Sequence, residues 1–308
     1  DTAYMLKCMS TTFCAQDIAV VRINSDVLAW RRTTTGMRRS KLPSAPGGRW
    51  VGLLLAFSTR TAEPLLLMPD GALQRLRVGA TSAIAARWMA RAEAGEVALL
   101  GSGWQAGGQL LALACVRNLE RVRCFSPTPS KRDDFCARMQ ARLGIPVEPH
   151  ARARDAVRGA DVVLCATNSV TPVMRAEWLE PGMHIGSIRE GELEPELLAR
   201  ADRVVIHDRA NMRADRIHVT HGLRTPDQHS VAQANPALHA LLDAPTLTEL
   251  VAGRVAGRES ERECNVFLNH HGMALQFAAV ASVILERAHA AGVGRELPGE
   301  WFTQDRHS

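Results

Sequence analysis

The chain has 308 residues, of which 46% are hydrophobic, 22% are charged and only 5% are aromatic. It carries 37 lysines and arginines against 32 aspartates and glutamates, which gives a formal net charge of +5. These values predict a globular protein of two domains, exclude wholesale disorder and argue against a surface that stacks nucleic-acid bases. We expect neither a nucleic acid nor a membrane as a partner, because no apolar run approaches the ~18 residues that a membrane span needs.

Residues 1–92 predict an antiparallel pair of strands followed by a helix. The apolar runs 50–58 and 63–68 are separated by a short turn, and 73–91 has an Ala-rich helical face. A small excess of basic residues precedes them, which we interpret as a solvated loop: Arg31, Arg32, Arg38, Arg39 and Lys41.

Between residues 96 and 207 the chain alternates between short apolar runs and helical segments. Nearly continuous apolar strands that are spaced by helices predict a parallel sheet covered on both faces. The predicted strands are 96–100, 121–125, 161–166, 183–187 and 203–207. The predicted helices are 104–116, 152–159 and 131–143, which Ser130 caps.

The C-terminal part predicts a connection and two helices. Residues 212–245 are rich in His, Pro and Asn and weak in pattern, which we interpret as a mobile connection. A short helix is predicted over 246–252, and 272–291 is apolar almost all round, which predicts burial within the subunit or at a subunit contact. The fold class is therefore α/β, with a domain of residues 93–220 inserted into a discontinuous domain of residues 1–92 and 221–308.

Seven cysteines, at positions 8, 14, 115, 124, 136, 165 and 264, follow no zinc-ligand spacing with one another or with histidine. Several of them stand in apolar runs. The sequence therefore predicts reduced thiols, a cytoplasmic protein and no metal site.

The most informative motif is a glycine pattern directly after the first strand of the predicted parallel sheet. Gly101, Gly103 and Ala106 form G-x-G-x-x-A, with Trp104 and Gln105 opening the next helix. The first glycine permits a tight turn, the second lets the backbone approach a pyrophosphate, and the alanine allows close packing of helix and strand. The strand–turn–helix context predicts dinucleotide binding, and the alternative is a glycine turn used only for packing.

The residues after the next strand predict NADP(H) in preference to NAD(H), which stays possible. Ser126 stands where an NAD-binding protein usually has an acid that binds the ribose 2′-hydroxyl. Ser126 and Thr128 offer hydroxyls and Lys131 and Arg132 offer positive charge, a combination that suits a 2′-phosphate. In the alternative interpretation the two cations are merely solvated.

Two further loops follow predicted strands of the sheet. In an open parallel sheet ligands bind beyond the carboxyl ends of the strands, so these loops can contact the ribose or the nicotinamide. The alternative is an ordinary polar loop in each place. The residues concerned are Thr167, Asn168 and Ser169, and Gly186, Ser187 and Ile188.

Several motifs together resemble the ornithine cyclodeaminase/mu-crystallin family: the GSGWQA loop, LRVGATSA at 76–83, WLEPGMH at 178–184, LVAG at 250–253 and GMAL at 272–275. The resemblance implies a Rossmann-type parallel sheet domain inserted into a discontinuous α+β substrate/dimerisation domain, and a homodimer. Members transfer a hydride between a nicotinamide and an amino or imino carbon next to a carboxylate. The expected partner is therefore a small-molecule carboxylate substrate.

The resemblance also implies positions for cationic substrate ligands. Arg77 matches the family arginine that helps to bind the substrate carboxylate, and its guanidinium suits a carboxylate bidentately. Lys7 and Arg22 fill two further cationic positions, with lysine and arginine exchanged relative to the family. The alternatives are a surface arginine on a helix and two cations at strand edges.

The loop after Ser187 departs from the family, which places a general acid/base aspartate there. Glu190 is a candidate substitute; otherwise Glu190, Glu192 and Glu194 are acids at a helix N-terminus. His270 and His271 can supply the proton transfer instead, or they form a helix-entry pair bonded to the backbone.

Three functions remain open. The first is an NADP(H)-dependent oxidoreductase that transfers a hydride to or from an imine or amine carbon next to a carboxylate, of an amino acid or a cyclic ketimine. The second is an ornithine cyclodeaminase-like ammonia lyase. The third is a non-catalytic NADPH-binding protein.

Overall fold

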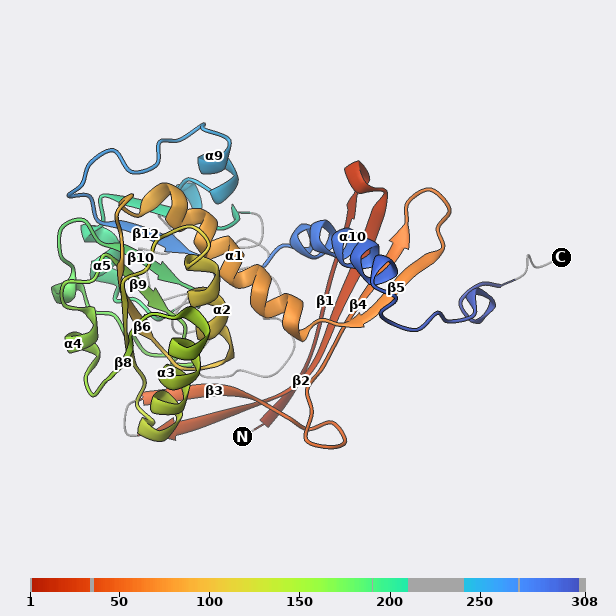
Figure 1. Cartoon of the computed structure of the whole chain (residues 1–308), viewed down its shortest axis with the longest axis horizontal. Helices are drawn as coiled ribbons and strands as arrows, with labels where there is room; N and C mark the ends of the chain where they lie inside the picture. The colour runs from red at the N-terminus through yellow and green to blue at the C-terminus, as the bar shows by residue number, and fades with distance from the viewer. Residues whose placement is uncertain (1, 34–35, 190, 210–240, 271, 305–308) are drawn as a thin grey trace. The chain divides into compact units, whose positions relative to one another are not determined.

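The computed structural model describes residues 2–33, 36–189, 191–209, 241–270 and 272–304. The chain divides into two compact units (Figure 1). The antiparallel unit consists of Asp1–Trp30, Ser40–Arg77 and Met273–Ser308, and the parallel unit of Arg31–Arg39 and Val78–Gly272. No helix in these described ranges is long and apolar enough to cross a membrane.

The antiparallel unit is built on a five-stranded sheet in the order β1-β2-β4-β5, with β3 paired to β2. Its strands are β1 (Thr2–Phe13), β2 (Ile18–Thr33), β3 (Gly36–Leu42), β4 (Val51–Ser58) and β5 (Pro64–Pro69). Helix α10 (Ala274–Ala290) packs on this sheet. Its residues Phe277, Ala278 and Ala281 form one hydrophobic core with Ile18 and Leu54 of the sheet. Burial of these apolar side chains stabilises the unit.

Helix α10 buries one face only. Leu275, Val280 and Val283 are exposed on the rest of its surface, so the helix is not buried all round within the described chain. The sequence could not show this difference, because the residues of both faces are apolar. Burial of the second face at a subunit contact stays a prediction.

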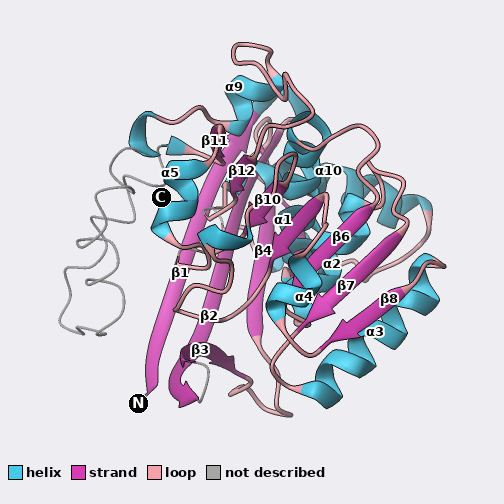
Figure 2. Ribbon diagram, turned by 90° about the vertical axis from the view of Figure 1, so that its left-hand side faces the viewer, coloured by secondary structure: helices cyan, strands magenta, loops and turns pink. Residues whose placement is uncertain are grey.

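The parallel unit contains a seven-stranded sheet in the order β11-β12-β10-β9-β6-β7-β8, and every neighbouring pair of strands is parallel. In Figure 2, β6, β7 and β8 lie side by side and α3 runs along β8. The strands are β6 (Glu96–Leu100), β7 (Arg121–Phe125), β8 (Val147–His150), β9 (Val162–Cys165), β10 (His184–Ser187), β11 (Arg203–Ile206) and β12 (Asn265–Leu268).

Helices cover both faces of the parallel sheet. Successive residues of β6 enter different cores, since Leu99 packs with α2 and α3 whereas Leu100 packs with α4 and α5. The helices of the chain before α10 are α1 (Gly71–Met89), α2 (Trp104–Leu113), α3 (Pro129–Leu143), α4 (Ala153–Val157), α5 (Pro195–Arg200) and α9 (Leu247–Val251). The prediction of an α/β fold with a Rossmann-type sheet is confirmed.

Two local predictions are wrong. Helix α3 begins at Pro129 with Thr128 as its N-cap, not after Ser130, since proline is favoured in the first helical turn. The basic stretch before the first predicted strand is not a solvated loop: Arg38 forms an antiparallel bridge with Ser169, and Lys41 forms an ion pair of 2.5 Å with Asp26. These contacts join residues far apart in the sequence, so local composition could not show them.

The domain division at residues 92 and 220 stays a prediction. The compact units lie elsewhere in the chain, because Ala86 and Ala90 belong to the core of the parallel unit and β12 pairs with β10 and β11. Residues 212–240 of the predicted connection lie outside the described residues. All seven cysteines are free.

Candidate functional site

The turn after β6 has the geometry that the glycine pattern predicts. Gly101 has a φ of +118°, and its N–H donates to the Phe125 carbonyl at 2.8 Å. A Cβ at this position would lie 2.3 Å from the Ala166 carbonyl oxygen, so only glycine fits without displacing the backbone. Strand order reverses between β6 and β9, and the loops after these two strands therefore meet where an open sheet binds its ligand.

The N-terminus of α2 is open to an anion. Gly103 is its N-cap residue with a φ of −88°, no side chain caps the helix, and a Cβ there would meet nothing within 4 Å. Trp104 is 60% exposed, Ala106 is fully buried, and the Gln105 Oε1 atom is buried without a partner in the described chain. Uncapped N–H groups at a helix start suit a phosphate, so the residues present fit a dinucleotide.

The segment after β7 offers one exposed cation. Lys131 is exposed, whereas Arg132 donates to the His150 carbonyl and to Asp133 Oδ1, both at 2.9 Å. Ser126 and Thr128 are half-buried, and no acid occurs between positions 126 and 132. The Nε and Nη1 atoms of Arg132 are therefore already engaged, which fixes its guanidinium, whereas Lys131 is an exposed ammonium.

The polar loop after β9 is held by its own contacts. The Thr167 N–H and hydroxyl both donate to Glu192 Oε1, at 2.7 and 2.8 Å. The Asn168 carbonyl accepts from the Arg39 N–H at 3.2 Å and from Arg189 Nη1 at 2.9 Å. Ser169 is buried and bonded to Thr171, so the exposed Asn168 side chain is the part of this loop that can reach a ligand.

Glu192 is the residue that sequence reasoning missed. It is fully buried, and it does not cap a helix, because α5 begins at Pro195 and has Glu194 as its N-cap. Its second oxygen accepts from the Ser187 hydroxyl at 3.0 Å and from the N–H groups of Ile188 and Arg189 at 3.1 Å. The carboxylate thus fastens the loop after β10 to the loop after β9.

Burial raises the pKa of the Glu192 carboxyl, although the hydrogen bonds from Thr167, Ser187 and Ile188 act in the opposite direction. A buried acid at the ligand edge of the sheet is a typical sign of a functional site. The interpretation of Glu192 as an acid at a helix N-terminus is therefore wrong.

His270 lies beside this cluster. Its Nε2 atom is 3.2 Å from the Ser187 hydroxyl, which is fully buried. Gly186 packs close to Leu164, and a Cβ there would approach the leucine Cδ2 to 3.3 Å. Two other candidates for proton transfer, Glu190 and His271, lie outside the described residues.

In the antiparallel unit, Arg22 is buried and paired. Its Nε donates to Asp70 Oδ2 at 2.6 Å, and Asn24 Nδ2 donates to the same oxygen at 3.2 Å. Gly52 makes room for this carboxylate, because a Cβ there would lie 2.0 Å from Asp70 Oδ1. Arg22 is therefore a fixed positive group on β2, and its charge is largely offset by Asp70.

Arg77 shares an aromatic ring with Arg22. The two guanidinium carbons lie 5.3 Å and 4.7 Å from the centre of the Phe277 ring. Arg77 donates to Gln74 Oε1 at 2.8 Å and to Gln276 Oε1 at 3.3 Å. Burial and the nearby charge of Arg22 lower the pKa of Arg77 to about 9, so it stays charged at neutral pH.

The register places Lys7 with these arginines. Lys7 stands opposite Asn24 and Met9 opposite Arg22 in the antiparallel pair β1–β2, and residues directly opposite share a face of a sheet. Lys7 is exposed, whereas Arg22 is buried. The structure thus places Lys7, Arg22 and Arg77 in one unit, with both arginines on Phe277.

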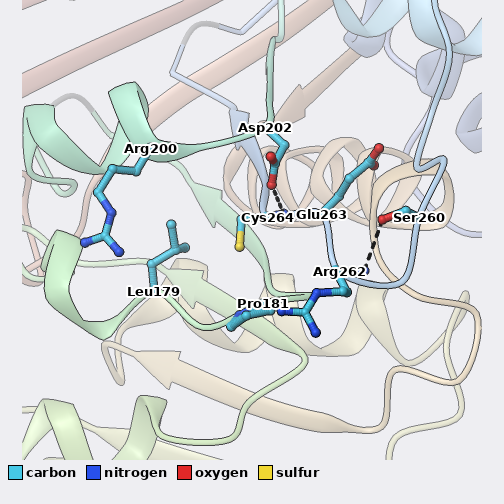
Figure 3. Close-up of a pocket in the computed structure, with 8 residues that line it drawn as sticks. All are labelled: Leu179, Pro181, Arg200, Asp202, Ser260, Arg262, Glu263 and Cys264. Atoms are coloured by element: carbon cyan, nitrogen blue, oxygen red, sulfur yellow. Dashed lines mark hydrogen bonds between the residues drawn. The ribbon is translucent and has the colours of Figure 1, made fainter.

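A separate cavity of about 380 Å³ opens at the amino ends of β10, β11 and β12 (Figure 3). Asp202 accepts a hydrogen bond of 2.7 Å from the Cys264 N–H at its wall. This is the opposite edge from Gly101, so the cavity is not the dinucleotide site. Its lining residues are Leu179, Pro181, Arg200, Asp202, Ser260, Arg262, Glu263 and Cys264. The described residues contain no cluster able to hold a metal ion.

His184, at the start of β10, should make stability depend on pH. Burial and the charges of Arg258 and Arg117 lower its pKa to about 3, whereas the unfolded chain binds a proton there below about pH 6.5. The contribution of His184 to the free energy of unfolding should therefore be constant above pH 6.5. Below that pH it should fall by about 1.4 kcal/mol per pH unit. Urea unfolding of the wild type and of His184→Leu at several pH values measures the difference. Equal slopes for both proteins would contradict it.

The model of the ornithine cyclodeaminase/mu-crystallin family matches residues 43–292. A Δ1-pyrroline-2-carboxylate reductase of Bacillus cereus is 32% identical over 251 residues, which are 80% of this chain and 74% of the relative. An alanine dehydrogenase of Archaeoglobus fulgidus is 30% identical over 276 residues, 88% of this chain and 79% of that one.

Solved structures show the same fold. The Thermococcus litoralis Δ1-pyrroline-2-carboxylate reductase, in complex with NADH and L-proline, has a TM-score of 0.71 at 24% identity and covers 96% of this chain and 90% of its own. An archaeal alanine dehydrogenase dimer with bound NAD has a TM-score of 0.72 at 25% identity, with 96% and 88% covered.

Proposed function

The chain belongs to the ornithine cyclodeaminase/mu-crystallin family, and from this premise we propose that it is an NADPH-dependent reductase of imines whose carbon bears a carboxylate. It is an enzyme of the imine reductase, dehydrogenase or cyclodeaminase type. The observation that carries the proposal is the open N-terminus of α2 behind Gly101, together with two buried arginines on Phe277. The first suits a dinucleotide and the second a carboxylate.

The nicotinamide, when bound, supplies the hydride that reduces the imine carbon. Arg77 would bind the substrate carboxylate, because its guanidinium remains charged at neutral pH. A carboxylate can replace the side-chain amides of Gln74 and Gln276 as its hydrogen-bond acceptor. Arg22, fixed by Asp70, lies over the same Phe277 ring as Arg77. Lys7 lies on the same face of the sheet and is the third candidate ligand.

Reduction of an imine also consumes a proton at nitrogen. Among the described residues at the carboxyl edge of the parallel sheet, His270 carries an imidazole, a common general acid, and it contacts Ser187 at the end of β10. Glu190 and His271 stay candidates for the same role.

Turnover tests the proposal directly. The purified protein is mixed with NADPH and, in turn, Δ1-pyrroline-2-carboxylate, its six-membered homologue, α-keto acids with ammonia, and ornithine. Loss of NADPH absorbance with a cyclic imine would support the reductase. Release of ammonia from ornithine without net loss of NADPH would indicate a cyclodeaminase. Tight NADPH binding without turnover of any substrate would indicate a nucleotide-binding protein.

Ser126→Asp should reverse the cofactor preference. A carboxylate there accepts from the ribose 2′-hydroxyl and repels a 2′-phosphate, so the Kd of NADPH should rise by about 10- to 100-fold while that of NADH falls. Fluorescence titration of Trp104 measures both constants, with Ser260→Asp at the opposite edge of the sheet as the control. Unchanged NADPH binding by Ser126→Asp would place the 2′-phosphate elsewhere.

A homodimer stays part of the proposal. It is supported by the exposed apolar face of α10 and by the relative that forms a dimer. The molar mass in solution, measured by light scattering, tests it, and a monomer at micromolar concentration would contradict it.

A further inference from the structure

Three polar groups form a continuous line at the carboxyl edge of the parallel sheet. Glu192 Oε2 lies 3.0 Å from the Ser187 hydroxyl, and that hydroxyl lies 3.2 Å from His270 Nε2. The groups come from three segments: the loop before α5, the end of β10 and the chain after β12. All belong to the parallel unit, so the line does not depend on how the two units are arranged.

Two partners of Glu192 are hydroxyls that can change from donor to acceptor, those of Thr167 and Ser187, and of these the Ser187 hydroxyl also contacts His270. The N–H groups of Thr167, Ile188 and Arg189 are fixed donors, and the Thr167 hydroxyl bonds to the other oxygen. The Ser187 hydroxyl can donate to an ionised Glu192 or accept from a protonated one. When it accepts, its own proton can go to His270 Nε2 or to the Arg189 carbonyl, which lies 3.0 Å from the hydroxyl. The two hydrogen bonds on either side of Ser187 can therefore reverse together, which is what proton transfer along a line requires.

The surroundings allow Glu192 to hold a proton. Burial raises the pKa of its carboxyl, and the adjacent Cys165 thiol on β9 is also buried, with its pKa raised by that burial. The other titratable or charged neighbours are His270, and Arg189, whose guanidinium donates to the Asn168 carbonyl. Glu194 faces away, since its carboxylate bonds to Ala176 and Arg175. No described guanidinium bonds to the Glu192 carboxylate.

We propose that Glu192 and Ser187 form a proton relay that recharges His270, an inference that rests on the proposed reductase function. As the imine carbon accepts the hydride, His270 Nδ1 gives its proton to the nitrogen, and the C–N π electrons form the new N–H bond. His270 Nε2 takes the proton of the Ser187 hydroxyl, which takes the carboxyl proton of Glu192. After the product leaves, a proton from water returns through His270 and Ser187 to Glu192. His270 is then the catalytic residue, and Ser187 and Glu192 are positioning residues.

The decisive variant is Ser187→Ala, which removes one oxygen and leaves four donors on Glu192. In isotope-labelled wild-type protein, NMR titration of His270 should show a second inflection from Glu192. Ser187→Ala should lose that inflection, and Glu192→Gln should lose it too. Ser82→Ala is the matched control, because this buried hydroxyl accepts from Asn269 Nδ2 at 2.9 Å and is not in the line. An unchanged His270 titration in Ser187→Ala would overturn the relay.

Steady-state kinetics provides a second test of the relay. Ser187→Ala should lower kcat by about 10- to 100-fold and change KM by less than about threefold. The loss in kcat is smaller than the full contribution of a general acid, because His270 itself remains. Its kcat should fall at a lower pH than that of the wild type, since His270 no longer draws on a stored proton. Glu194→Gln should keep the wild-type profile. A kcat–pH profile of Ser187→Ala that matches the wild type would overturn the relay.

Failure of the relay can be distinguished from failure of the reductase function. If the wild type binds NADPH but reduces no imine, the reductase function is wrong and the relay falls with it, whatever the titration shows. If the wild type is active and both variants keep the wild-type titration and pH profile, only the relay is wrong.

Discussion

Gly103→Val is expected to raise the Kd for NADPH by about 100-fold or more and to leave the fold intact. A Cβ at this position meets no atom within 4 Å, and the φ of −88° is ordinary for valine, so the free energy of unfolding should change by about 1 kcal/mol, the cost of a poorer N-cap residue. The added methyl groups would occupy the space that a pyrophosphate needs to reach the N–H groups of α2. Losing two charge-assisted hydrogen bonds of about 1.5–3 kcal/mol each accounts for the change.

Titration of Trp104 fluorescence with NADPH, combined with thermal unfolding, separates the two effects. Gly71→Val is the matched control, because Gly71 also starts a helix with open space around its Cβ position. Gly101→Ala should behave in the opposite way, losing stability first, since its Cβ would strike the Ala166 carbonyl and its φ is positive. Wild-type affinity in Gly103→Val would mean that the glycine turn serves packing alone.

Arg77→Leu should lower kcat/KM for the carboxylate substrate by about a thousandfold and leave the Kd of NADPH unchanged. The effect corresponds to about 4 kcal/mol, the usual cost of removing one partner from a buried charged pair. The fold should tolerate the change, because the variant removes a buried guanidinium whose pKa is already lowered to about 9 by burial and by Arg22. Arg77→Lys should recover little, since an ammonium cannot form the bidentate pair.

Steady-state kinetics and nucleotide titration on the same preparations measure both quantities. Arg87→Leu, an exposed position on the same helix, controls for the loss of one positive charge. Equal losses of substrate and nucleotide binding in Arg77→Leu would identify Arg77 as a structural residue.

The phosphate-binding turn could be predicted from the sequence because its determinants are local. Gly101 and Gly103 act through their own backbone, and the strand before them and the helix after them are continuous with them in the chain. The strands of the parallel sheet between 96 and 207 were predictable for a similar reason: each is a short apolar run that ends in a turn. β8 and β12 were not predicted: β8 reads Val-Glu-Pro-His, which is not an apolar run, and β12 has only three apolar residues after Asn265.

The partners of the charged residues could not be predicted. Asp70 meets Arg22 across 48 positions of sequence, through the register of antiparallel strands. Glu192 meets Thr167 across 25 positions, because the carboxyl ends of parallel strands share one edge. In the sequence nothing singles out Asp70, and Glu192 is one of three similar acids, so only the fold shows their partners.

The position of β12 has a consequence for synthesis of the protein. This strand comes from residues 265–268 but lies between β10 and β11, which precede it by tens of residues. A nascent chain that has emerged only as far as β11 has no partner for that strand, and one edge of β10 is open as well. The ribosome must therefore deliver β12 before the sheet can close, and until then the edges of β10 and β11 are open to pairing with other chains.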